Sequence, residues 1–428
     1  MGMLLKSIIS NWKKSIGLFI ELIIVTVIGW ILLEPVAIKT SRISLPAGYD
    51  FDRLVTTVFS KLDERTYDYD STANENQSVY YQRIIDLIRQ RPEVESATFS
   101  GSLGFESGSY WGTGFPADSA YYNLNTEESQ ISTAYISYVP GTDYFATYGI
   151  KDPEGKPFIE PENDGYGYIV SQTLAKGMYP AKSAIGQNLF ELTEENTSPT
   201  PIIGITADTP YRKSDGRTAV AFYQTRLDGN NIEGITMRVK DGVNPRRFLD
   251  DLSTQLSDYK IGNIYLSEPE LMTDRRAKSM EYIDKELTQN WVMVIFFLVN
   301  VILGIAGTFY IQCRSRISDA GVMRAFGASR CRIEWSIIGE AFITVFLAWL
   351  AGSAIYFIYL HFSDTEIAAE VNKITQIIRP MWYDTAATRY SVIGGCVLLL
   401  LLISAIIGVY LPARRVGRVP IVDSLRDE

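Results

Sequence analysis

The sequence contains very little histidine and cysteine, and each shortage excludes a kind of site. His361 is the only histidine among 428 residues, so no Ser-His-Asp or Cys-His arrangement can be built inside the long segment 34–290. The three cysteines, Cys313, Cys331 and Cys396, all lie outside that segment and show no C-x-x-C spacing. We therefore expect neither a disulfide framework nor a metal site.

The sequence also lacks a phosphate-binding loop. There is no G-x-x-x-x-G-K-[ST] motif, and the single Gly155-Lys156 pair, in DPEGKPF, lacks the spacing that lets backbone amides surround a phosphate. We expect no ATP hydrolysis by this route and no cofactor bound to this chain.

Long apolar runs, in contrast, are abundant. Four blocks of about 19 or more residues are each long enough to span a bilayer. They are predicted as transmembrane helices at 15–33, 291–311, 335–360 and 391–411. The sequence after the first block offers no A-x-A cleavage site, so we expect that block to stay as an anchor.

Short flanking segments give the orientation of these spans. The N-terminal segment 1–14 and the loop 312–334 carry an excess of lysine and arginine and are predicted to be cytoplasmic, whereas the loop 361–390 is slightly acidic and is predicted to lie outside. The tail 412–428 is then cytoplasmic. Residues 3–14 have helical apolar spacing, which fits either an amphipathic helix on the inner leaflet or a plain positive flank.

The segment 34–290 is therefore predicted to be extracytoplasmic. It holds 25 basic and 38 acidic residues, a net charge of −13. Such an acidic segment argues against nucleic acid as a partner.

Within this segment, strand and helix patterns are mixed. Residues 51–62 alternate like a strand, 80–91 have helical spacing, and a strand-like VESATFS follows. Further strand patterns occur in GYIVS, PIIGITADT, AVAFYQT and GITMRVKD, and the helix NPRRFLDDLSTQL is predicted to be capped by Asn244. Residues 100–165 fit loops and short strands. The pattern is typical of an α+β domain.

No glycine or proline interrupts the chain between Leu271 and Leu303. This predicts one helix of about 33 residues, roughly 50 Å long, which exceeds a bilayer core. Its first half is charged and its second half, from Trp291, is apolar. We expect a single rod that joins the outside segment to the second span.

Two acidic residues, Glu21 and Glu340, lie inside apolar blocks. An ionisable residue within a membrane is a functional candidate by default, but both lie near the cytoplasmic ends of their spans, where a structural role is the simpler interpretation. The sequence does not assign their roles.

The cytoplasmic loop after the second span reads as a short charged amphipathic helix. Its apolar side would hold Val322, Ala325 and Phe326, and Gly327 would end it. A loop that only sets topology needs no apolar side, so we interpret it as a site for a partner protein. The candidate partner-binding residues are Arg316, Asp319, Gly321, Val322, Met323, Arg324, Ala325, Phe326, Gly327 and Ala328.

Here the chain resembles the MacB/FtsX-type ABC transporter permeases. In that family the second span is followed by a run like R-x-R-x-x-E-I-G-x-x-R-A-x-G-A, and this chain reads RSRISDAGVMRAFGA, with Asp319 for Glu and Ala320 for Ile. The tail PARRVGRVPIVDSLRDE is similar to the family's P-A-x-x-A-x-x-x-x-P-x-E-A-L-R ending. Similarity to the periplasmic core domain occurs in RPEVESATFS, VPGTDYFATYGI, GYIVSQTLAKGMYPAKSAIGQNLF and PIIGITAD.

The resemblance implies an α-helical membrane protein with four transmembrane helices and a large α+β extracytoplasmic domain between helices 1 and 2. Within that domain an insertion is expected near 101–222. It further implies a permease subunit in the bacterial inner membrane, paired with a second copy, whose cytoplasmic helix contacts a separate ATP-binding subunit that binds ATP and Mg. A periplasmic adaptor or envelope partner is a further expectation, and substrates would include drugs, peptides, lipoproteins or envelope signals.

One alternative from another class stays open. A membrane-anchored sensor, whose outside domain binds a peptide and signals without ATP, would have the same topology. A neighbouring gene with a Walker A motif favours the permease, whereas a histidine kinase alone favours the sensor. An outside enzyme is disfavoured by the missing histidines.

Overall fold

The computed structural model describes residues 12–72, 77–107, 111–162, 166–192, 197–227, 231–314, 322–323, 325–362 and 373–418. Residues 1–11, most of the amphipathic helix expected over 1–14, and the tail from 419 lie outside this part, whereas residues 12–14 are helical. The chain forms two compact units. The helix unit holds 1–40, 284–370 and 382–428, and the sheet unit holds 41–283 and 371–381.

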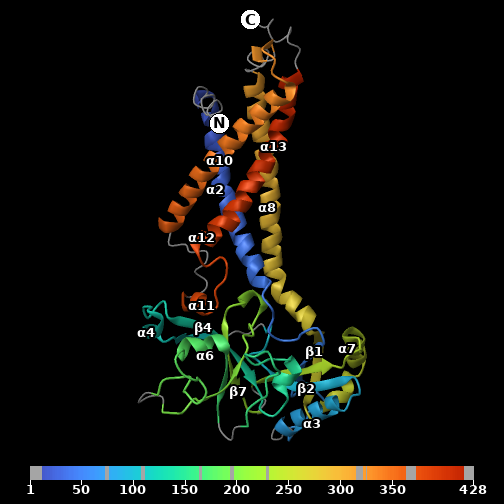
Figure 1. Cartoon of the computed structure of the whole chain (residues 1–428). Helices are drawn as coiled ribbons and strands as arrows, with labels where there is room; N and C mark the ends of the chain where they lie inside the picture. The colour runs from blue at the N-terminus through green and yellow to red at the C-terminus, as the bar shows by residue number, and fades with distance from the viewer. Residues whose placement is uncertain are drawn as a thin grey trace. The chain divides into compact units, whose positions relative to one another are not determined.

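The helix unit is built from four long helices (Figure 1). They are α2 (Trp12–Ile43), α8 (Met272–Arg314), α10 (Arg330–Phe362) and α13 (Gly395–Arg418). A short helix α12 (Ala386–Arg389) and one π-helical stretch (Tyr390–Gly394) precede α13. All four contain a stretch that is long and apolar enough to cross a membrane, as the sequence predicts.

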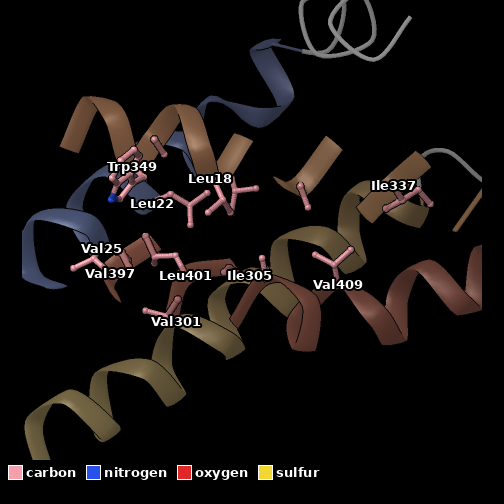
Figure 2. Packing of buried hydrophobic residues seen from close by; sticks show 14 of the residues in the cluster. Leu18, Leu22, Val25, Val301, Ile305, Ile337, Trp349, Val397, Leu401 and Val409 are labelled. Carbon is pink, nitrogen blue, oxygen red and sulfur yellow. The ribbon is translucent and has the colours of Figure 1, made fainter. Parts of the chain in front are cut away.

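The interior of the helix unit is apolar and closely packed. Leu22 and Val25 of α2 lie near Val301 of α8 and Val397 of α13 in this cluster (Figure 2). Gly408 brings α13 close to α8, because a Cβ there would lie only 3.1 Å from the backbone nitrogen of Ala306. Small residues allow such close approach where lipid offers helices little hydrophobic gain on association.

Helix α2 continues past the end of the predicted first span. It includes Pro35 and ends at Ile43. Proline is tolerated within helices of membrane proteins because neighbouring groups can satisfy the freed carbonyl. Lys39 of α2 forms an ion pair with Glu286 of α8, which joins the two helices beyond their apolar stretches.

The first sheet of the sheet unit has five strands that pair antiparallel. Their order is β2 (Val94–Gly101), β8 (Ile232–Val239), β1 (Leu54–Lys61), β10 (Ile264–Leu271) and β9 (Lys260–Ile261). With α3 (Gln77–Arg89), α7 (Pro245–Thr254) and the 3₁₀ turn η3 (Leu256–Tyr259), this is a split βαβ arrangement. The strand–helix–strand order predicted at the beginning of this segment is present as β1, α3 and β2, but β8 lies between β1 and β2 in the sheet.

The second sheet is mixed. Its order is β3 (Gly112–Pro116), β4 (Gln130–Tyr138), β7 (Ala219–Gln224), β5 (Tyr168–Ser171) and β6 (Ile202–Thr206). The pairs β4–β7 and β5–β6 are parallel, and the others are antiparallel. All five strands come between β2 and β8 in the chain, so the second sheet is inserted into the first.

Short helices accompany the second sheet. They are α4 (Ser119–Tyr122), α5 (Tyr144–Tyr148), α6 (Gln172–Met178), the 3₁₀ turn η2 (Lys213–Asp215) and, from the loop between α10 and α13, α11 (Lys373–Ile378). The core of this part contains Ile131, Val170, Leu174 and Ile374, all fully buried.

Candidate functional site

The predicted partner-binding loop presents apolar side chains to solvent. Arg316, Asp319, Gly321 and Arg324 lie outside the described residues. Phe326 is 89% exposed, and Met323 and Val322 are about half exposed, at 48% and 44%. We call these three residues the apolar turn.

The apolar turn is held in place by backbone hydrogen bonds. Phe326 N donates to Val322 O at 3.1 Å, and Ala328 N donates to Met323 O at 3.0 Å. Gly327 has φ of +91°, a left-handed conformation that favours glycine and ends a helical turn. Ala328 packs against the core of the helix unit, so the turn is fixed next to α10.

A buried carboxylate links three helices elsewhere in the helix unit. Glu34 of α2 is 1% exposed. Its Oε2 accepts a hydrogen bond from Tyr356 Oη of α10 at 2.6 Å, and its Oε1 accepts one from Arg389 Nη1 of α12 at 3.1 Å. Trp30 stacks on Tyr356 with ring centroids 5.2 Å apart. This group was not predicted from the sequence, although Glu34 directly follows one apolar block and Arg389 lies two residues before another.

The two acids predicted as candidates lie in different surroundings. The carboxylate of Glu21 lies against α8, because a Cβ on Gly304 would come within 2.2 Å of Glu21 Oε1. Glu340 is largely buried, at 6% exposure, within α10. The structure does not bring these two acids together into one described site.

A second buried carboxylate lies at the base of α8, within the sheet unit. Glu106 is 3% exposed and has φ of 54°, which strains a residue other than glycine. Its Oε2 accepts a hydrogen bond from Ser279 Oγ at 2.5 Å, and its Oε1 accepts from Lys213 N at 3.1 Å and Tyr49 Oη at 3.4 Å. Arg276 Nε lies 3.9 Å from Oε1. We call these five residues the Glu106 cluster.

The Glu106 cluster joins four chain segments. Tyr49 comes from the connection after α2, Glu106 from the loop after β2, Lys213 from the loop before β7, and Arg276 and Ser279 from α8. The Arg276 guanidinium also lies 4.1 Å above the ring of Phe51. Burial, followed by the nearby Glu106 carboxylate, raises the pKa of Tyr49, so its hydroxyl stays protonated and can donate.

The second sheet borders an open cavity of about 720 Å³. It is lined by β3 and by the segment after α6, including Phe115, Tyr179, Lys182, Leu189 and Phe190. Among the residues that the structure describes, no group of three or more His, Cys, Asp or Glu side chains could hold a metal ion.

Comparison with known proteins supports the motif-based resemblance. Residues 291–421 match the FtsX-like permease C-terminal domain. This FtsX-like region contains the apolar turn and the helices α10 and α13, and it confirms the resemblance read from the sequence. The match covers less than a third of the chain, and no curated protein sequence matches the chain.

Solved structures with some likeness come from extracytoplasmic domains. One is the extracellular domain of the noncanonic ABC-type transporter YknZ from Gram-positive bacteria, 10% identical, covering 50% of this chain and 100% of that chain, with a TM-score of 0.29. Another is the periplasmic region of MacB from Actinobacillus actinomycetemcomitans, 14% identical, covering 55% and 94%, with a TM-score of 0.30. At these scores the likenesses carry no argument about this chain.

Proposed function

We propose that the chain is the permease subunit of an ABC transporter in the bacterial inner membrane. A separate ATP-binding subunit contacts the apolar turn and hydrolyses ATP, and α8 carries the resulting movement to the extracytoplasmic sheets. The observation that carries this proposal is the exposed apolar turn within a region that matches an FtsX-like permease domain. An exposed aromatic, with an exposed valine and methionine four and three residues before it, is the kind of anchor that fills a pocket on a partner protein.

The apolar turn lies between α8 and α10 in the chain, so a force on it would act on both helices. It follows α8, which begins directly after β10, and it precedes α10. Ser329, just before α10, accepts at its Oγ a hydrogen bond from the backbone nitrogen of Arg332 in the first turn of that helix, at 3.3 Å. A partner that moves the turn therefore acts on two of the four long helices.

The experiment is co-purification of the ATP-binding subunit with the full-length permease. Phe326→Asp should abolish the complex, because burying an unpaired carboxylate in an apolar pocket costs several kcal/mol. Phe326→Leu, which keeps an apolar side chain, is the matched control and should retain most of it. Membrane insertion should be normal in both variants. Full recovery of the complex with Phe326→Asp would show that the apolar turn is not the contact.

A further inference from the structure

The loop between α10 and α13 contributes a helix to the interior of the sheet unit. The side chain of Ile374 in α11 is fully buried in the cluster between α6 and the second sheet, and Ile378 packs against the same cluster. Gly177 of α6 makes room, since a Cβ there would lie 3.1 Å from Ile378 Cδ1. Six residues thus bury one isoleucine fully and a second one partly, which is more than a loop that only connects two spans requires.

Polar contacts hold both ends of α11. At its start, Lys373 Nζ forms an ion pair with Glu128 Oε1 at 2.8 Å, and Ile374 N donates to Glu128 O at 3.3 Å. At its end, Arg217 Nη2 donates to the backbone oxygen of Arg379 at 2.8 Å. Arg217 is itself only 3% exposed, so a buried cation satisfies a carbonyl that the helix end leaves free.

The chain after α11 returns to the helix unit almost at once. Arg379 is held by Arg217 in the sheet unit, whereas Trp382 packs against the apolar core of the helix unit. Only Pro380 and Met381 separate them. Three Cα steps reach at most about 11 Å, and Pro380 restricts the backbone of Arg379 to extended conformations. This connection has little slack.

We propose that α11 is a fixed strap that makes the second sheet follow α10 and α13. This inference rests on the proposed function. The first sheet is continuous with α8, since Leu271 ends β10 and Met272 begins α8. When the ATP-binding subunit shifts α8 relative to α10 and α13, the strap converts the shift into a displacement between the two sheets.

The decisive variant lengthens the strap without disturbing its docking. A six-residue Gly/Ser insertion between Met381 and Trp382 should leave the ATPase complex and the hydrogen-exchange protection of 373–379 at wild-type level. It should lower ATP-coupled transport at least tenfold. The same insertion after Glu154, in an exposed turn of the sheet unit, is the matched control and should leave transport unchanged.

A distance measurement reads the displacement directly. Spin labels at Arg83 and Thr113, both exposed, report on the first and second sheets of the full-length complex. Their separation should change when a non-hydrolysable ATP analogue is added to wild type, and this change should vanish in the lengthened variant. Ile374→Asp, which removes the docking itself, should lose both the protection of 373–379 and the distance change.

The outcomes separate the strap from the proposed function. If the lengthened variant formed the ATPase complex and transported at the wild-type rate, the strap proposal would be wrong, but the proposed permease function would be unaffected. The strap proposal would also be wrong if the distance between the two spin labels in the wild-type complex did not change when the ATP analogue was added. If the wild-type chain bound no ATP-binding subunit at all, the proposed function would fail, and this inference with it.

Discussion

At the scale of single residues, the buried carboxylates of Glu34 and Glu106 are the groups whose removal should matter most. Each lies almost wholly out of water and accepts hydrogen bonds from more than one segment of the chain. A buried charge is retained only where partners compensate for its lost hydration. Both acids therefore fix how distant segments meet.

Glu106→Gln is expected to destabilise the protein by about 3 kcal/mol, because the nearby Arg276 guanidinium would stay buried without its counter-charge. The thermal unfolding midpoint of the full-length protein in detergent measures this loss. Glu127→Gln, at an exposed acid of the same unit, is the control and should shift the midpoint little. Equal midpoints for the two variants would mean that Glu106 contributes no net stability.

The Glu128–Lys373 pair should make strap docking sensitive to acid. The hydrogen bond from Lys373 lowers the pKa of Glu128 in the folded protein. A lowered folded pKa adds stability that is present above the unfolded pKa, about 4.5 for this carboxyl, and is lost as the pH falls through the folded pKa. The unfolding midpoints of wild type and Glu128→Gln should therefore differ near neutral pH and converge in acid. A difference that is independent of pH would rule out the ion pair as its source.

At the scale of elements, the sequence predicts those whose signals are local. The apolar blocks correspond to four long helices, and Asn244 caps α7 by accepting hydrogen bonds from the backbone nitrogens of Arg246 and Arg247. The helix predicted from Leu271 to Leu303 lies within α8 from Met272 onward, whereas Leu271 is the last residue of β10. In each case the pattern lies within one stretch of chain and needs no knowledge of a partner.

Elements that depend on distant partners escaped prediction. β10 was not predicted, and β4 was covered only by the general expectation of loops and short strands over 100–165. The pairing of β2 with β8 joins strands that are separated in the chain by the whole inserted sheet. Helix α11 is only six residues long, too short for a periodic pattern, and its burial depends on side chains far away in the chain. The Glu106 cluster was missed for the same reason, because its four segments meet only in the folded protein.

The short turn that presents Phe326 provides an element-scale prediction. Gly327 is in the left-handed region, so Gly327→Val should strain the turn by about 1–2 kcal/mol and misplace the aromatic ring. We expect weaker co-purification of the ATP-binding subunit, measured as a higher dissociation constant. Gly327→Asn is the control, since asparagine adopts this conformation more readily, and it should bind more tightly than the valine variant. The reverse order would exclude backbone conformation as the cause.

At the scale of the whole molecule, the connections between the two units determine what can be transmitted. Helices α2 and α8 both run from one unit into the other, and the strap adds a third connection. Lys39 and Glu286 join α2 to α8 beyond their apolar stretches. A change at the apolar turn can therefore reach the sheets through α8 only if that helix behaves as a stiff element.

Helix α8 should accordingly lose its function when a joint is inserted. It runs without interruption from Met272 to Arg314. A Gly-Gly insertion after Glu286 costs only about 1 kcal/mol per glycine in helix propensity, too little to unfold either unit, but it introduces flexibility where force must pass. We expect normal expression and an intact ATPase complex, together with ATP hydrolysis that no longer supports transport in cells. An Ala-Ala insertion at the same place shifts the helix register equally without a joint, so a greater loss with Gly-Gly isolates stiffness as the cause. Wild-type transport by the Gly-Gly variant would instead make α8 a passive tether between independent units.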